Sequence, residues 1–366
     1  MASSSGRCYW YMNVVPLCAM VAVECFSVVS SVLFKAATQK GLSYYVFIAY
    51  SYAISTFILL LPFLFIFFTT RSSGLPTFKA SLVGRIFLLG VIGFVFQLIG
   101  YKGLEFSSPT LASALSNLVP AFTYVLAILF RMEKATLKSS STQAKIIGSI
   151  VSIIGALVVT LYKGPIVLSA SASSSSLLSS SSSQGDWVLG AFLLAASYTL
   201  PPLWFIVQTQ VMEQYPVELV VVFLYNVCGT LISAPACILV ESSFSVWRLK
   251  LDITLLAVIF SGFCGCLVSV VHTWAIHLKG PVYVSSFKPL SVVIAAAMSV
   301  IFLGDALYIG SVIGAGILSI GFYAVLWGKA KSSAELSEEY CLNRKLTCNS
   351  TTPLLNNQQG KQSFPI

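Results

Sequence analysis

The sequence predicts an all-α membrane protein whose ten transmembrane helices form an inverted repeat of two five-helix halves. Three observations predict this fold: the composition, the spacing of the apolar stretches, and residues that recur in both halves. The 366-residue chain is 57% hydrophobic and 9% charged, with a net charge of +9, whereas a soluble protein carries roughly 25% charged residues. So few charges cannot cover a water-facing surface. The composition therefore excludes a soluble enzyme, a disordered protein and, despite the positive charge, a nucleic-acid-binding protein.

Ten apolar stretches are long enough to cross a bilayer, which takes about 20 helical residues. They are too long for barrel strands and lack the alternating pattern of such strands. Backbone groups inside lipid must also bond within their own segment, which favours helices. The first stretch is longer than the apolar part of a signal peptide, so we expect it to remain as a span. The ten expected helices cover approximately residues 14–34, 45–68, 84–104, 110–130, 145–162, 187–207, 219–240, 253–276, 282–303 and 307–327.

Basic residues concentrate on one predicted side of the membrane. Cytosolic loops carry an excess of Lys and Arg, so this side is expected to be the cytosol and to hold both chain termini. Its basic residues lie after the second span, after the fourth span and after the last one: Arg71, Lys79, Arg85, Arg131, Lys134, Lys138, Lys145, Lys329 and Lys331.

A Ser-rich segment divides the chain. Residues 164–186 contain few apolar residues other than Ala and Leu and are typical of a flexible linker. We therefore expect a first five-helix half at 1–163, a second at 187–330, and a disordered cytosolic tail at 331–366.

The two halves share a weak internal repeat. Pro109 and Pro281 are 172 residues apart, and Glu133 and Asp305 have the same separation. Because five is an odd number of helices, the second copy enters the membrane in the opposite orientation to the first. Inverted repeats of this kind are typical of secondary transporters, in which two half-shells rock around a central site.

Several strings also resemble a known plant family. They are SPTLASALSNLVPAF at 108–122, FRMEKATLK at 130–138, HTWAIHLKGPVYVSSFKPLS at 272–291 and FLGDALYIGSVIGAGILSIGFY at 302–323. These are similar to the Walls-Are-Thin-related proteins, also called nodulin-21-like EamA transporters or "usually multiple acids move in and out" transporters, of the drug/metabolite transporter superfamily. The resemblance implies two EamA-like halves and transport of amino acids or related metabolites such as auxin. It also implies the plasma membrane as first choice of location and the vacuolar membrane as second.

The chain departs from that family at two places that can touch substrate. Many members have Gln-Asn where this chain has Gln97-Leu98, and many have an Arg in the second span where this chain reads Tyr50-Ser51-Tyr52. The substrate range of the family is therefore not carried over to this chain.

Glu24 is the most informative residue of the first span because it lies near the midpoint of residues 14–34. An ionised group there costs on the order of 2.5–3.5 kcal/mol by insertion scales. Ser27 and Ser31 follow at i+3 and i+7, on the same helix face. This polar face predicts a cavity in which Glu24 binds a substrate amine or carries a coupled proton. The alternative is a structural hydrogen bond between helices.

Lys288 is the second charged residue well inside a span. It can bind a substrate carboxylate or neutralise Glu24, and a site with one charge of each sign suits a zwitterion such as an amino acid. The alternative is that its side chain extends to the cytosolic interface, since this span is expected to begin on that side.

Other spans contribute polar and aromatic candidates. A His can titrate near neutral pH, and a Trp can stack on a ring substrate or anchor the helix at the membrane interface. The predicted substrate-binding set is Glu24, Gln97, Asn117, His272, Trp274 and Lys288, with Glu24 as the candidate for proton coupling.

No catalytic or nucleotide-binding motif occurs in the sequence. Cys264-Gly-Cys266 lacks the spacing of a metal site, so we expect no metal, no cofactor and no enzymatic activity, and a gradient as the driving force. The expected partners are the lipid bilayer and a small-molecule substrate. Small-residue pairs such as Gly310 and Gly314 leave open either packing within the bundle or a homodimer.

Three rival functions remain. A passive facilitator or channel-like pore is the first, although the sequence shows no filter motif or ring of charges. A membrane-embedded transferase is the second, but acidic residues are sparse on the predicted outer loops. A sugar-nucleotide carrier is the third, and the scarcity of Lys and Arg inside the spans disfavours so anionic a ligand.

Overall fold

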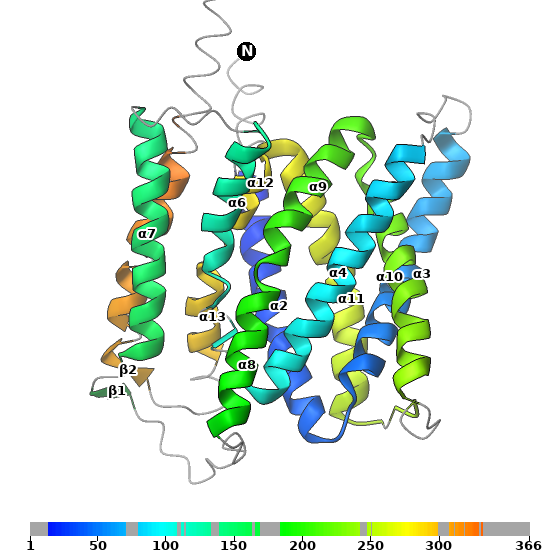
Figure 1. The fold of residues 1–366 in the computed structure, drawn as a ribbon, viewed down its shortest axis with the longest axis horizontal. Helices are drawn as coiled ribbons and strands as arrows, with labels where there is room; N and C mark the ends of the chain where they lie inside the picture. The colour runs from blue at the N-terminus through cyan, green and yellow to red at the C-terminus, as the bar shows by residue number, and fades with distance from the viewer. Residues whose placement is uncertain are drawn as a thin grey trace, which may run out of the picture.

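The structure is a computed structural model of the chain. It describes residues 14–70, 80–107, 111–112, 115–132, 139–162, 165–168, 184–241, 247–249, 251–298, 307–310, 312–317, 319–328 and 331. Within these ranges the protein is a bundle of helices that run between two opposite ends of the molecule (Figure 1).

Among the described residues, six helical segments are long and apolar enough to cross a membrane. One of them combines two helices, α8 and α9, which are separated by a short turn at Tyr198 and Thr199. The elements of these segments are α2 (Val15–Gln39), α3 (Tyr44–Thr70), α4 (Ala80–Phe106), α8 (Gln184–Ser197), α9 (Leu200–Gln214), α10 (Glu218–Val240) and α11 (Ile253–Lys279). The predicted spans in these regions are confirmed as helices, and α2 runs five residues beyond its predicted end.

Helices also occupy the other four predicted stretches, so the positions agree with the sequence, but a count of ten membrane spans stays a prediction. They are α6 (Leu118–Leu129), α7 (Ser140–Leu161), α12 (Pro281–Ser285), α13 (Leu290–Met298) and an apolar helix at Val312–Gly328 that includes undescribed residues.

The all-α prediction missed one short pair of strands. β1 (Ile166–Leu168) pairs antiparallel with β2 (Leu307–Tyr308) at one end of the bundle, and the amide of Ile309 donates a further bond to the Pro165 carbonyl at 2.9 Å. The β-branched pair Ile166-Val167 suits an extended backbone, so part of the segment read as a flexible linker is ordered. The rest of that linker, up to residue 183, and the tail after residue 331 lie outside the described residues.

Helices of the predicted first half pack mainly against helices of the second half. α2 lies against α11, α3 lies against both α10 and α11, and α4 lies against α8, α9 and α10. A pairwise exchange of helices maps these contacts onto one another. The exchanged pairs are α2 with the α8–α9 segment, α3 with α10, and α4 with α11. In Figure 1, α2 and the α8–α9 segment cross the bundle in opposite directions.

Glycines allow the closest of these approaches. A Cβ at Gly90 on α4 would lie 2.7 Å from the Cβ of Cys228 on α10. A Cβ at Gly262 on α11 would lie 2.7 Å from the Cβ of Ile54 on α3. Both contacts need a residue without a side chain, as close helix packing in membranes does. The two glycines are 172 residues apart, the separation of the internal repeat.

Candidate functional site

A cavity of about 300 Å³ lies among α2, α3, α4, α8, α9, α10 and α11. Many serine hydroxyls line it, together with a set of aromatic side chains: Phe26, Tyr52, Phe96, Tyr101, Tyr198, Trp204, Phe205 and Tyr225. Such a mixture of apolar walls and few polar groups is typical of small-molecule sites.

An ion pair is the most polar feature of this cavity. The Lys288 Nζ donates to Glu24 Oε1 at 2.8 Å, and both residues line the cavity. The Glu24 side chain is 1% exposed and that of Lys288 is 15% exposed. The pair joins residues 264 positions apart, one from each predicted half, and leaves the site without net charge from these two groups.

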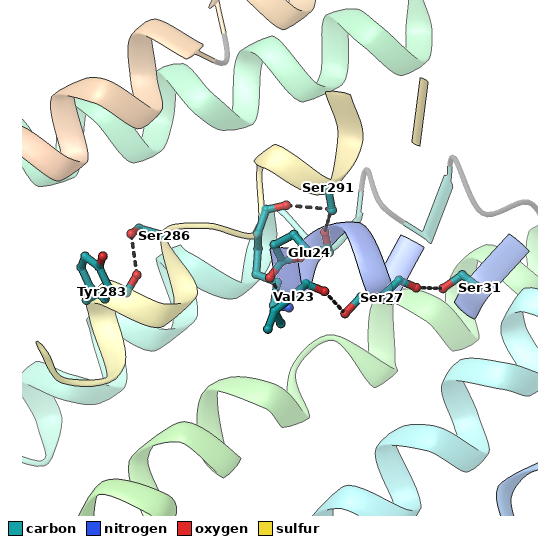
Figure 2. Close-up of polar contacts among 9 residues, drawn as sticks. Val23, Glu24, Ser27, Ser31, Tyr283, Ser286 and Ser291 are labelled. Atoms are coloured by element: carbon teal, nitrogen blue, oxygen red, sulfur yellow. Dashed lines mark hydrogen bonds and ion pairs between the residues drawn. The ribbon is translucent and has the colours of Figure 1, made fainter. Parts of the chain in front are cut away.

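The serines beside Glu24 present mainly acceptor oxygens to the cavity. Ser27 Oγ donates to the Val23 carbonyl at 2.9 Å, and Ser31 Oγ donates to the Ser27 carbonyl at 3.0 Å. Figure 2 shows these residues along α2 with Glu24. Because each hydroxyl gives its hydrogen to its own helix, only its lone pairs remain for a ligand. This helix face therefore suits a ligand that donates hydrogen bonds.

Lys288 lies where a helix is interrupted. The turn at 286–289 separates α12 from α13, and the amides of Phe287 and Lys288 bond three residues back, that of Lys288 to the Ser285 carbonyl at 3.1 Å. Pro289 has no amide hydrogen and so favours the interruption. Ser291 Oγ donates to the Lys288 carbonyl at 2.7 Å and lies 3.2 Å from Ser116 Oγ. Figure 2 shows Ser291 beside Glu24. The interruption thus holds a lysine and two serines at the cavity wall.

His272 on α11 lies near the ion pair. It is 8% exposed, lines the cavity, and meets the Phe205 ring edge-on at 5.9 Å. Its Nε2 atom is buried and makes no hydrogen bond within the part of the chain that the structure describes. A buried polar atom without a partner costs about 1–3 kcal/mol, so this nitrogen is a natural contact for a bound ligand.

Gln97 also lines the cavity, from α4. The structure therefore brings four of the six predicted residues together: Glu24, Gln97, His272 and Lys288. Asn117 and Trp274 do not line this cavity, although Ser116, beside Asn117, does. A substrate contact for Asn117 and Trp274 stays a prediction.

Sequence reasoning missed several lining residues, including Ser116, Ser261 and Ser291. A single serine within an apolar span carries no signal that separates a cavity wall from ordinary packing. Among the described residues, no group of three or more His, Cys, Asp and Glu side chains is arranged to hold a metal ion.

Comparison with known proteins gives a consistent answer. The profile of the EamA-like transporter family matches residues 15–161. Three WAT1-related proteins of Arabidopsis thaliana are 56%, 54% and 46% identical, over 88%, 89% and 99% of this chain and 89%, 91% and 97% of their own length. A solved crystal structure with 14% identity has a TM-score of 0.56, covering 83% of this chain and 98% of its own, and shows the fold alone. This chain therefore belongs to the WAT1-related proteins, an EamA-like transporter family of the drug/metabolite transporter superfamily and not a family of enzymes.

Proposed function

We propose that this protein is a secondary transporter that moves small organic solutes, such as amino acids or related metabolites including auxin, by alternating access. The observation that carries the proposal is the Glu24–Lys288 ion pair, which lies inside a cavity enclosed by both predicted halves. An ionisable pair inside a membrane is expensive, and such pairs mark transport pathways.

The charge of the cavity supports a zwitterionic or weakly acidic substrate. A substrate can replace each residue as the partner of the other. Its ammonium can take the place of Lys288 beside Glu24, and its carboxylate can take the place of Glu24 beside Lys288. The acceptor oxygens of Ser27 and Ser31 favour the ammonium side. The wall contributed by Trp204 and Phe205 suits an apolar side chain or ring. Among the described residues that line the cavity, Lys288 is the one lysine or arginine that a highly anionic ligand such as a sugar nucleotide could pair with.

The alternating-access part of the proposal is supported by the exchange symmetry of the helix contacts. Tyr52 and Tyr225 are 173 residues apart and their hydroxyls lie 3.2 Å from each other. Thr56 and Thr230 are 174 apart with a 3.0 Å hydroxyl contact. Residues at the repeat spacing meet in this way only near a two-fold axis. We place that axis between α3 and α10, and the cavity beside it, as in other inverted-repeat carriers.

Transport by reconstituted protein tests the proposal. Uptake of a labelled amino-acid panel and of auxin into liposomes is measured with and without a pH gradient. We expect saturable uptake that unlabelled substrate on the opposite side accelerates. Uptake without that acceleration would favour the passive facilitator instead, and no uptake of any panel member would contradict the proposal.

The Glu24→Gln variant tests proton coupling separately. It should lose the dependence of uptake on pH but retain exchange, because the amide cannot release a proton. Glu213→Gln is the matched control, since Glu213 is exposed on α9. Unchanged pH dependence in E24Q would remove Glu24 from the coupling role.

Location and topology complete the proposal. We propose the plasma membrane, with the vacuolar membrane as the second choice, and both termini in the cytosol. Fluorescent tags at each end, probed with protease on intact cells and on permeabilised cells, test both points.

A further inference from the structure

Lys35 connects α2 to the end of α4. It lies near the C-terminal end of α2, is 7% exposed, and its Nζ donates to the Leu104 carbonyl at 3.1 Å and the Glu105 carbonyl at 2.6 Å. These oxygens belong to the last turn of α4, where carbonyls have no partner within the helix and the helix dipole attracts a cation. One side chain thus joins two helices at the end of the bundle where α2 ends.

Gln208 connects α9 to α11 at the opposite end of the bundle. It is 1% exposed, and its Nε2 donates to Thr273 Oγ1 at 2.9 Å. Because α2 and the α8–α9 segment cross the bundle in opposite directions (Figure 1), the C-terminal ends of α2 and α9 lie at opposite ends. The Lys35 and Gln208 contacts are therefore separated along the direction of transport.

The two contacts occupy equivalent places in the repeat. Lys35 and Gln208 are 173 residues apart, the separation that the Tyr52–Tyr225 contact shows. The exchange that maps α2 onto the α8–α9 segment also maps α4 onto α11. The contact of Lys35 between α2 and α4 therefore corresponds to the contact of Gln208 between α9 and α11. The partner atoms differ, because Lys35 reaches backbone carbonyls in the last turn of α4, whereas Gln208 reaches the side-chain hydroxyl of Thr273 about one turn earlier on α11.

Each bridge lies beside a buried apolar cluster, with the cavity between the two ends. At the Lys35 end, the rings of Phe34 and Tyr101 are 4.4 Å apart and those of Phe34 and Phe47 are 4.9 Å apart. At the other end, Phe205 and Phe287 belong to a second cluster. The cavity is lined by Tyr101 and Phe205, one member of each cluster. Opening either end requires its cluster and its bridge to separate.

We propose that Lys35 and Gln208 are equivalent latches that hold the two ends of the transport pathway closed and so determine which end opens. This inference rests on the two-fold arrangement proposed above. The latches differ in strength, because Lys35 makes two charge-assisted bonds to backbone carbonyls whereas Gln208 makes one neutral bond to a hydroxyl. The end held by Gln208 is therefore the one that opens more readily in the empty protein.

Access to a cavity cysteine from each side tests the proposal. Cys264 lines the cavity and is buried, so it is kept as the single reporter while the other eight of the nine cysteines are replaced by alanine. A membrane-impermeant maleimide is applied to intact cells and to inside-out vesicles, and the labelling rate is measured. Lys35→Met should speed labelling about tenfold or more from the face where α2 ends, and Gln208→Leu about threefold from the opposite face.

Matched controls separate a latch from a purely structural contact. Lys40→Met and Gln210→Leu remove the same groups from neighbouring positions that are not part of either bridge, and should leave both rates unchanged. Lys35→Arg keeps a cation and its donors, and should restore slow labelling. A drop in melting temperature with equal acceleration from both faces would identify Lys35 as a helix cap and overturn the proposal.

The outcome is independent of substrate identity. Acceleration of both variants from the same face, or of neither variant, would overturn the latch pair even if transport is observed. Opposite-face acceleration in a protein that transports none of the tested solutes would support the latches and contradict the proposed function instead.

Discussion

Removing Lys288 should destabilise the protein far more than removing an exposed lysine. In Lys288→Met, the Glu24 carboxylate is 1% exposed and loses the partner that lies 2.8 Å away. Breaking one side of a buried ion pair costs about 3–5 kcal/mol. The loss of stability stays below the upper end of this range if the Glu24 carboxylate takes up a proton instead of staying charged. Glu24→Gln should cost less, because the remaining Lys288 is 15% exposed and can turn toward water in the cavity.

The double variant decides whether this pair interaction is the cause. Glu24→Gln with Lys288→Met leaves no uncompensated charge, so its loss of stability should be smaller than the sum of the two single losses by about 2 kcal/mol or more. The assay is thermal denaturation of purified protein in detergent, followed by size-exclusion chromatography of a fluorescent fusion.

A half-buried pair on α4, with more exposed side chains, provides the matched control. Lys102 and Glu105 form an ion pair at 2.9 Å with side chains 35% and 31% exposed. Their coupling should not exceed about 1 kcal/mol. If the losses at Glu24 and Lys288 are additive, or their coupling is no larger than that of Lys102 and Glu105, the reasoning from burial is refuted.

Three further predictions concern packing, capping and the cavity. Gly90→Ala should lower stability by about 1–3 kcal/mol through overpacking against α10, whereas Gly84→Ala, with nothing within 4 Å of its added Cβ, should not lower it; melting temperatures compare the two. Asp252→Ala should lose about 0.5–2 kcal/mol, because Asp252 Oδ1 caps α11 by accepting from the Thr254 amide at 2.8 Å, and Asp252→Asn should restore most of the melting temperature. His272→Phe should keep the ring contact with Phe205 and remove the unpartnered Nε2, so stability should be unchanged or higher while the KM for transported substrate rises; a parallel loss of stability and transport would contradict a ligand-facing role.

The sequence predicted the residues whose cost in lipid is large. Glu24 stood out because an acidic group at the midpoint of a span needs a partner, and Lys288 was one of few groups able to supply it. Hydropathy also located the six long segments, since about 20 apolar residues have few alternatives to a helix. Both inferences were possible because each depends on a free-energy contribution of several kcal/mol that arises within a single helical segment.

Features that depend on contacts between segments were not predictable. The contacts of Lys35 are one example, because nothing in the local sequence shows that α2 continues to Gln39 or that α4 ends beside it. The pairing of β1 with β2 has the same origin, whereas the interruption at Tyr198 and Thr199 has a local cause, because Pro201 and Pro202 lack the amide hydrogens that would continue α8. Asn117 is 2% exposed but does not line the cavity, a distinction that depends on how its helix packs and that the sequence does not show.

The repeat gives the cavity a symmetric frame with asymmetric chemistry. The repeat spacing carries Glu24 onto Ser197 and Lys288 onto Ser116, and all four residues line the cavity. In the proposed arrangement, an ion pair therefore joins α2 to the turn before α13, while the equivalent positions, at the end of α8 and just before α6, carry two hydroxyls. The charged contact is costlier to break than a contact between hydroxyls, unless a substrate supplies an ammonium to Glu24 and a carboxylate to Lys288. Because Glu24 and Lys288 belong to different predicted halves, the proposed movement of one half against the other would strain this contact. A substrate that replaces it lowers the barrier to that movement, which is how a symmetric bundle can make its motion depend on its cargo.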